Sequence, residues 1–596
     1  MSTHQSLDLK VPKQCRTSLT FADASPDAIE TWLTDLPKAN LGVMAKQLYN
    51  ALQEVNQLQI SYAPRFDIME LFRPQCYYVC DQLGKHFLGH SIVLTEQQRK
   101  IANLAQTIQY QLTIGYKHIV RDMLLGGKRP EGSKELLVNA THRAMSDTSH
   151  TLLRAYQLYC PIPKNLWHEL HQLYRLAESL QLLQQVVSDP QNSFIHDYTI
   201  EANYKRMLLL ACSRPNQVRQ GDLLQIFNAL EYWTDAVVLG PARDNIPTTF
   251  IIDLESDMGP AYRALYSKTL KTHHRALEPT ELTETINLFL KDPDECELTI
   301  PKAISKELLL HLSHAWGPIQ KRTFKRIPAS GTLELSVGLT ATHYYLCGKQ
   351  EFRLWLEVQH VADHIPERQK ERFDKKEYDV WSPAFDARHN EQRVLAKDEA
   401  NISYTPEEER KHKPIFPVFS ANLLNTSPGG YCVSWQGHLP QHLQTGELLG
   451  IHEVEYNSWN LAIIRWLHLE AENQVELGIE LLTCNARPCA MCLLRKIEDS
   501  SQYMRGFFVP EIKALDQPAS LITPRIPFQV GHKIKVNLDG VIHKAQLTNL
   551  LLSTSSFNQF EFHLTDLDSS INKQPSTHKP KNKDDDDEFG GIWDIL

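Results

Sequence analysis

The chain has 596 residues, of which 42% are hydrophobic and 22% are charged, as expected for an ordinary globular protein. This length exceeds what one hydrophobic core supports, so several domains are expected. The formal net charge of -9 argues against a general nucleic-acid-binding protein, which would carry a surplus of basic residues, and we expect no DNA partner. A local basic pocket for a small dianion is compatible with this charge.

Targeting and membrane signals are not visible in the sequence. The first residues contain no apolar stretch typical of a secretory signal, and no apolar run reaches the roughly 18 residues of a membrane span. Most of the 11 cysteines lie in apolar runs, where a free thiol behaves as a small buried hydrophobic group. We therefore expect a cytoplasmic protein with reduced thiols and no membrane span.

Helical signals dominate the first half of the chain. Ser25 and Pro26 are typical of an N-cap and a first helical position, and Thr95 and Gln98 match a capping box. Apolar residues then recur at helical spacing. These patterns predict an all-α domain over residues 1–315, with roughly ten to fourteen helices in an irregular bundle or in a stacked array of helix pairs.

Strand signals begin after this region. Residues 332–339 alternate apolar and polar side chains, as a half-buried strand does, and we assign residues 316–345 to a β domain. Between residues 349 and 414, 28 of the 66 residues are Asp, Glu, Lys or Arg, nearly twice the average of the chain. Because such a segment buries little surface, we expect residues 346–414 to form a charged insertion. Strand patterns resume over residues 415–497.

The C-terminal part contains a second β signal and a tail. Apolar runs flank the turn-forming pair Asp539-Gly540, which predicts a hairpin within a β unit over residues 498–570. Residues 571–596 are a polar linker and an acidic tail that cannot fold alone. The tail is either a solubilising extension or a docking peptide whose apolar anchors are Phe589, Ile592 and Trp593.

The segment Asn425-Thr-Ser427-Pro-Gly-Gly430 has the chemistry of a ligand-binding turn. It lies between two apolar, β-prone runs, so we predict a strand, a tight turn and a strand. The glycines permit positive φ and close approach of a ligand to the backbone. The short side chains of Asn425 and Ser427 can bond to a neighbouring backbone or to a base edge. On local chemistry alone, the plainer interpretation is a hairpin turn.

With two later segments, this turn resembles the PilZ domain, a small six-stranded barrel that binds cyclic di-GMP. The family motif D/N-x-S-x-x-G corresponds to Asn425, Ser427 and Gly430, and two typical strand segments correspond to Ile464-Arg465-Trp466 and to Gly478-Ile479-Glu480-Leu481. The resemblance implies a PilZ-like β-barrel over residues 316–345 plus 415–497. The expected fold class is therefore α+β multidomain, with an all-α N-terminal helical bundle or array, the PilZ-like barrel and an additional β unit.

The PilZ family also carries R-x-x-x-R just before the barrel, and Arg322 and Arg326 match this pair. An arginine fork suits both phosphates and the acceptor edge of guanine. The separation of Arg326 from the turn, about a hundred residues, is longer than the family usually shows, and the charged insertion accounts for it because loops tolerate long insertions. The basic cluster that begins at Arg410 is the alternative, closer to the turn but without a second arginine in register.

No enzyme signature is present in the sequence. Walker loops, nucleophile elbows and dinucleotide fingerprints are absent. Cys484, Cys489 and Cys492 form one C-x2-C element with a third thiol, but a structural zinc site needs a fourth ligand at suitable spacing. His168 and His171 lack the spacing of a metalloprotease helix. We predict no enzyme, no catalytic residue, no metal and no cofactor.

The resemblance implies a bacterial signalling receptor that binds cyclic di-GMP through Arg322, Arg326, Asn425, Ser427 and Gly430. Binding would be transmitted to a protein partner in motility, biofilm or secretion control. The alternative is an adaptor or scaffold whose degenerate barrel binds protein partners only, and the long separation of the arginines from the turn keeps it open. The two hypotheses differ in whether the two guanidinium groups lie beside the turn.

Overall fold

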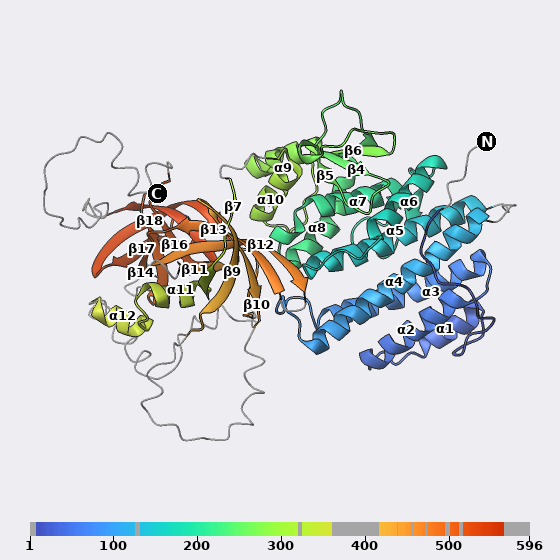
Figure 1. Ribbon diagram of the computed structural model, residues 1–596, viewed down its shortest axis with the longest axis horizontal. Helices are drawn as coiled ribbons and strands as arrows, with labels where there is room; N and C mark the ends of the chain where they lie inside the picture. Colours follow the sequence, from blue (N-terminus) through green and yellow to red (C-terminus); the bar gives the residue numbers. More distant parts are fainter. Residues whose placement is uncertain are drawn as a thin grey trace, which may run out of the picture. The chain divides into compact units, whose positions relative to one another are not determined.

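The computed structural model describes residues 7–125, 132–319, 325–359, 416–437, 439–440, 442–453, 458–471, 474–494, 501–511 and 517–565 (Figure 1). The chain divides into two compact units. The first comprises Met1–Gln350, Lys376–Cys484 and Ser553–Phe557, and the second comprises Glu351–Lys375, Asn485–Leu552 and Asn558–Leu596. The first unit contains a helical region and one β-barrel, and the second contains another β-barrel.

The helical N-terminal region is confirmed. Within its described residues lie ten α-helices, which are α1 (Pro26–Thr34), α2 (Leu41–Gln57), α3 (Tyr62–Gly84), α4 (Glu96–Leu125), α5 (Ser133–Gln157), α6 (Leu166–Ser179), α7 (Ile200–Cys212), α8 (Gln220–Trp233), α9 (Thr280–Lys291) and α10 (Lys306–Trp316). The long helices α3, α4 and α5 pack side by side (Figure 1). Four short 3-10 helices connect the others: η1 (Pro215–Gln217), η2 (Thr234–Ala236), η3 (Arg263–Leu265) and η4 (Pro293–Glu295). None of the described helices is both long enough and apolar enough to cross a membrane.

Two helix starts follow the predicted capping chemistry. The Ser25 side chain accepts a hydrogen bond from the backbone N–H of Ala28 at 3.4 Å, and Pro26 occupies the first position of α1. Before α4, the Gln98 N–H donates to the Thr95 hydroxyl at 3.2 Å, and the Gln98 side-chain oxygen accepts from the Thr95 N–H at 3.0 Å. This reciprocal pair satisfies two donors that the helix leaves unpaired.

The helical region also contains short strands that the sequence analysis did not predict. One pair is β1 (Val186–Ser188) with β2 (Asp197–Thr199), and a four-stranded sheet has the order β3 (Val238–Pro241), β6 (His274–Glu278), β4 (Phe250–Asp253) and β5 (Ala261–Tyr262). These strands have two to five residues, which is too short for the period-two alternation on which a strand prediction rests. The region is therefore mainly, but not entirely, helical.

The first barrel closes from six antiparallel strands. They are β8 (Thr332–Val337), β9 (Phe419–Ser427), β10 (Gly430–Gln436), β13 (Gln474–Thr483), β12 (Trp459–Ala471) and β11 (Leu448–Glu453), in the order of the ring. A seventh, short strand, β7 (Ile327–Pro328), pairs with β9 outside the ring. Inward-facing residues such as Val433, Ile464 and Leu477 are fully buried and form the barrel core. The predicted PilZ-like strands are confirmed, and α11 (Leu339–Leu346) follows β8.

The helical region and the first barrel, which share one compact unit, contact each other directly. The backbone N–H of Leu469 in β12 donates to the carbonyl of Tyr159 at 3.0 Å. The Arg219 guanidinium donates twice to the Thr445 carbonyl, at 3.0 and 2.9 Å. The side chains of Ile92 and Tyr159 are buried within the barrel core cluster. These contacts connect the barrel to the helices through both backbone and side chains.

The second barrel is also closed, in the order β14 (Arg487–Leu493), β15 (Met504–Val509), β16 (Ser520–Pro524), β19 (Phe557–Leu564), β18 (Val541–Ser553) and β17 (Lys533–Leu538). The predicted Asp-Gly hairpin joins β17 to β18, with positive φ of 51° at Asp539 and 84° at Gly540. Helix α12 (Phe352–Val358) lies in this unit, where the Arg505 guanidinium is 4.5 Å from the centre of the Phe352 ring.

One boundary from the sequence differs from the strand pairing. A barrel that ends at residue 497 would include residues 487–493, but β14 pairs with β15 and β17 of the second barrel. The composition does not change at this point, because both barrels consist of similar strands, so the sequence carries no signal for the boundary. Most of the predicted charged insertion and the tail residues Phe589, Ile592 and Trp593 lie outside the described residues.

Candidate functional site

The Asn425–Gly430 segment forms the predicted hairpin. Strands β9 and β10 are antiparallel, with Ser427 opposite Gly430, so that Pro428 and Gly429 make a two-residue loop. The Ser427 hydroxyl donates to the Gly430 carbonyl at 3.3 Å. The Gly429 carbonyl accepts from the N–H of Leu481 at 3.1 Å, which ties the loop to β13. The turn is therefore held on two sides by contacts within the barrel.

Gly430 is required by its surroundings. Its φ is 147°, and a Cβ atom at this position would lie 2.1 Å from the carbonyl oxygen of Ile479. Such a contact is far inside van der Waals distance and involves the backbone, so relieving it would require β10 or β13 to move within the packed barrel. The last position of the motif therefore has a structural reason within the barrel, in addition to any contact with a ligand.

The strand β7 lies next to this turn. In its antiparallel pairing with β9, Ile327 is opposite Thr426 and Pro328 is opposite Asn425. Arg326 directly precedes Ile327, so the register continues Arg326 toward Ser427. Arg326 is exposed. The structure thus brings Arg326, Asn425, Ser427 and Gly430 to one end of the barrel.

An electrostatic effect agrees with this placement. Burial raises the pKa of the Cys432 thiol and Glu476 raises it further, whereas the charge of Arg326 and a hydrogen bond with Asn425 lower it. Cys432 is the residue opposite Asn425 on β10. The Arg326 guanidinium is therefore close enough to the β9–β10 hairpin for its charge to act on a side chain there.

Arg322 lies outside the described residues, as does the alternative basic cluster at Arg410. The structure therefore gives a position for one arginine of the predicted pair. In the sequence, Arg322 precedes Arg326 by four residues, between the end of α10 at Trp316 and the start of β7 at Ile327.

One ion pair beside the turn could not be predicted from the sequence. Arg465 on β12 binds Glu480 on β13 through two hydrogen bonds of 2.7 and 2.9 Å, and Glu480 is the residue opposite Gly430. Both side chains are about half exposed. Both residues belong to the two motif segments, but only the register of β12 and β13 shows that they pair. The guanidinium neutralises the charge of the Glu480 carboxylate beside the turn.

The same two segments pack on each other through an aromatic ring. Trp466 is opposite Gly478, and a Cβ atom at Gly478 would lie 1.8 Å from the indole Nε1 of Trp466. Glycine therefore makes room for the ring on the barrel surface, an arrangement that stabilises strands carrying glycine. The arginine-tryptophan and glycine-isoleucine-glutamate segments thus have a structural role in holding β13 beside the turn.

The chemistry of this end of the barrel suits a small phosphate ligand. Arg326 supplies a planar cationic fork, and the turn supplies an amide, a hydroxyl and glycine backbone that a ligand can approach. None of these groups forms a nucleophile with an adjacent base, so the arrangement suits binding rather than covalent catalysis.

The three cysteines of the C-x2-C segment, which were considered above as zinc ligands, differ in exposure. Cys489 and Cys492 are buried, and Cys484 is exposed.

Comparison with known families gives matches along the chain. The N-terminal domain of the cyclic-di-GMP receptor FimW matches residues 27–243, its middle PilZ domain matches residues 249–488, and the FimW C-terminal beta-barrel domain matches residues 489–565. The matched families are named for a receptor and not for an enzyme.

A curated relative, the cyclic-di-GMP receptor FimW of Pseudomonas aeruginosa, is 36% identical over 616 aligned residues, which cover 99% of each chain. The comparison with solved structures gives no match. The similarity extends over the helical region and both barrels, so it concerns the whole architecture and not the PilZ barrel alone. The chain therefore belongs to the FimW family of cyclic-di-GMP receptors, with an N-terminal domain, a middle PilZ domain and a C-terminal β-barrel.

Proposed function

We propose that this chain binds cyclic di-GMP between the segment that carries Arg322 and Arg326 and the turn formed by Asn425, Ser427 and Gly430. The observation that carries the proposal is the β7–β9 pairing, which brings Arg326 to the turn across a long stretch of sequence. Membership in the FimW family supports the choice of ligand. The protein acts as a receptor and not as an enzyme.

The ligand and the site have complementary chemistry. Cyclic di-GMP presents two phosphates and two guanines, and each guanine presents the O6 and N7 acceptors. Arginine meets either group with paired N–H donors and also stacks on a base plane. The small side chains of the turn and Gly430 let the ligand approach the barrel backbone. Arg465 pairs with the Glu480 carboxylate and neutralises a charge that would otherwise repel a dianion.

Binding would act on the connection between the helical region and the barrel. Arg322 and Arg326 lie between the end of α10 at Trp316 and the start of β7 at Ile327. A ligand that bridges these arginines to the turn stabilises one arrangement of this connection, and so shifts the population of the chain toward it. The output is a changed contact with a protein partner in motility, biofilm or secretion control, for which Phe589, Ile592 and Trp593 are the candidate anchors.

The test is a calorimetric titration of the purified full-length chain with cyclic di-GMP. We expect saturable binding at ligand concentrations of roughly tens of micromolar or less, which corresponds to about 6 kcal/mol or more of binding free energy. GMP serves as the control, because it lacks the second phosphate and the second guanine. Absence of binding heat with cyclic di-GMP, or equal binding of GMP, would refute the proposal.

A further inference from the structure

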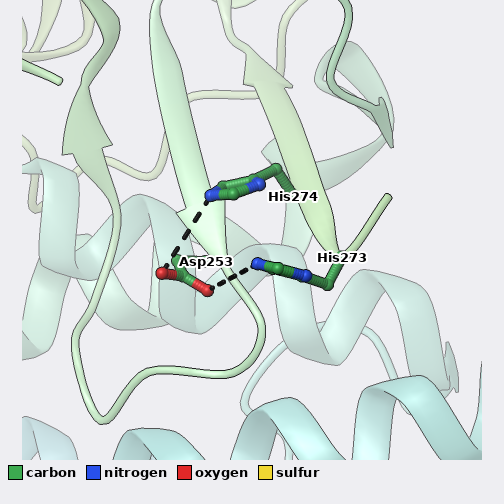
Figure 2. Close-up of side chains that lie close together, drawn as sticks. All are labelled: Asp253, His273 and His274. Atoms are coloured by element: carbon green, nitrogen blue, oxygen red, sulfur yellow. Dashed lines mark ion pairs between the residues drawn. The ribbon is translucent and has the colours of Figure 1, made fainter. Parts of the chain in front are cut away.

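A cluster of side chains away from the barrel has the composition of a metal site. Asp253 is the last residue of β4, His274 is the first residue of β6, and His273 directly precedes it. The pairing of β4 with β6 places Asp253 opposite His274. The carboxylate lies beside the two imidazoles, and each of its oxygens faces a ring nitrogen of one of them (Figure 2).

The distances within this cluster are those of donors around a common point. Asp253 Oδ1 is 3.5 Å from His273 Nε2, and Asp253 Oδ2 is 4.0 Å from His274 Nε2. One donor atom from each of the three residues lies within 4.8 Å of the other two. A tetrahedral zinc ion, with bonds of about 2.0–2.1 Å, holds its donors roughly 3.3 Å apart, so a shift of about 1 Å at these strand ends would bring them into range.

Direct hydrogen bonds do not account for this grouping. Separations of 3.5 and 4.0 Å between nitrogen and oxygen are too long for good hydrogen bonds. The hydrogen bond to the Asp253 carboxylate comes instead from the backbone N–H of Glu255, at 3.1 Å to Oδ1. The three side chains are little exposed, at 18% for Asp253, 15% for His273 and 2% for His274. The three side chains therefore converge in a partly buried place without good hydrogen bonds to one another, an arrangement of donors that one cation can share.

The other ring nitrogens have partners that orient both imidazoles. His273 Nδ1 lies 3.4 Å from Glu255 Oε2, an ion-pair distance about as long as that to Asp253, and a small approach would give the carboxylate–histidine arrangement that commonly surrounds a metal site. The backbone N–H of Lys271 donates to His274 Nδ1 at 2.8 Å, and the Lys271 carbonyl oxygen lies 3.3 Å from the same nitrogen. Nδ1 is therefore an acceptor, and the neutral ring carries its proton on Nε2; a cation at Nε2 requires this proton to move to Nδ1, which then faces the Lys271 carbonyl. The Tyr266 hydroxyl lies 2.6 Å from His274 Nε2. A metal bound to Nε2 would replace this hydrogen bond.

We propose that Asp253, His273 and His274 bind a first-row divalent cation of the zinc type, with Glu255 orienting His273. Two imidazoles and one carboxylate are borderline ligands that suit Zn²⁺ better than Mg²⁺ or Ca²⁺, which prefer oxygen alone. Three protein ligands leave at least one coordination position for water or another oxygen donor. The metal would join β4 to β6 at one end of the small sheet. Because its ligands come from two separate strands, no local sequence motif reveals the site.

The experiment uses the full-length chain, stripped of metal with a chelator, and a zinc titration against a chromogenic competitor. His273→Gln and Asp253→Asn test the ligands, because both side chains are partly exposed and their variants are expected to fold. His86→Gln, at an exposed histidine, is the matched control for the other histidines of the chain. We expect one tight site in the wild type and in His86→Gln, and its loss in both ligand variants. Glu255→Gln should weaken zinc binding by about 10-fold to 100-fold.

Thermal unfolding supplies a second measurement. Zinc in excess should raise the Tm of the wild type and of His86→Gln but not of the ligand variants, since a cation that binds only the folded chain stabilises it. Unchanged zinc affinity in His273→Gln and Asp253→Asn, or no uptake by the wild type, would overturn the proposal. Circular dichroism of the metal-free proteins verifies that the variants are folded. A parallel titration with cyclic di-GMP keeps failure of this proposal distinct from failure of the proposed receptor function.

Discussion

Ile327 lies directly opposite Thr426 in the antiparallel pairing of β7 and β9. This pairing joins two positions about a hundred residues apart, and it is possible because loops accept long insertions at little entropic cost. The residue before Ile327 is Arg326, and the residue after Thr426 is Ser427. The arginine segment and the polar turn therefore belong to one end of the barrel despite their separation in sequence, which is the geometry that a shared ligand requires.

The polar side chains of the turn should each contribute to ligand binding. Asn425→Ala removes the amide side chain that hydrogen-bonds with Cys432, and Ser427→Ala removes the hydroxyl that donates to the Gly430 carbonyl. We expect each variant to lose about 1 kcal/mol of cyclic di-GMP binding, roughly a fivefold weaker Kd by calorimetry. Asn422→Ala is the control, because Asn422 is exposed on the same strand before the turn. Equal affinity of all three variants would argue against a role for the turn.

The Arg465–Glu480 pair offers a test of electrostatics. Arg465→Ala leaves the Glu480 carboxylate unpaired opposite Gly430, where it repels a dianion. We expect a loss of about 1 kcal/mol in ligand binding, with little effect on folding because exposed pairs stabilise weakly. The double variant Arg465→Ala, Glu480→Gln should recover most of the affinity, since it removes the charge. A double variant that binds as weakly as Arg465→Ala would show a direct contact of Arg465 with the ligand instead.

Gly430 should be intolerant of any side chain. In Gly430→Ala the new Cβ meets the Ile479 carbonyl at 2.1 Å, so we expect destabilisation by at least about 3 kcal/mol together with loss of ligand binding. Gly437→Ala is the matched control, because Gly437 has a positive φ of 98° and a Cβ atom added there would meet no atom within 4 Å. It should cost only about 1–2 kcal/mol, the strain of the backbone alone. Urea unfolding measures both values, and equal losses would contradict the steric explanation.

A buried histidine in the helical region makes stability depend on pH. Burial, the main cause, lowers the pKa of His142 to about 3, and Arg143 contributes to this while Asp189 opposes it. In the unfolded chain this imidazole takes up a proton near its ordinary pKa of about 6.5, so the unfolded state binds more protons between these values. The stability contributed by neutral His142 is therefore complete above about pH 6.5 and declines as the pH falls, by up to about 1.4 kcal/mol per pH unit.

The measurement is urea unfolding of the wild type and of His142→Gln at several pH values between 7.5 and roughly 5. The difference between their slopes isolates His142, because other groups also titrate. One of these is Asp147, whose pKa burial raises to about 6, and which therefore acts in the opposite direction as the pH falls. Parallel slopes for the two proteins would mean that His142 does not titrate as its burial requires.

Local chemistry was sufficient to predict the features that depend on neighbours in sequence. The β9–β10 hairpin, the Asp539-Gly540 hairpin and the Thr95–Gln98 capping box are all present, because turns and caps are determined by a few adjacent residues. The PilZ barrel was predicted from a resemblance, and the strand order agrees with six closed strands. The proximity of Arg326 to the turn was expected from the family pattern and not from spacing.

Features that depend on strand register could not be predicted. The sheet formed by β3, β6, β4 and β5 consists of strands too short to show a period, so the region was expected to be entirely helical. The Asp253, His273 and His274 cluster follows from the β4–β6 pairing and has no motif spacing. The Arg465–Glu480 pair likewise needs the register of two long strands. In each case the residues are visible in the sequence, but their contacts are set by tertiary structure.

The most direct test of the receptor account is a calorimetric titration of cyclic di-GMP into wild type, Arg326→Ala and Arg243→Ala, with Arg243 as an exposed arginine in the helical region. The account predicts that Arg326→Ala loses about 1–3 kcal/mol of binding free energy, whereas Arg243→Ala binds as the wild type does. Wild-type affinity in Arg326→Ala would contradict a site built from the β7 segment and the Asn425–Gly430 turn.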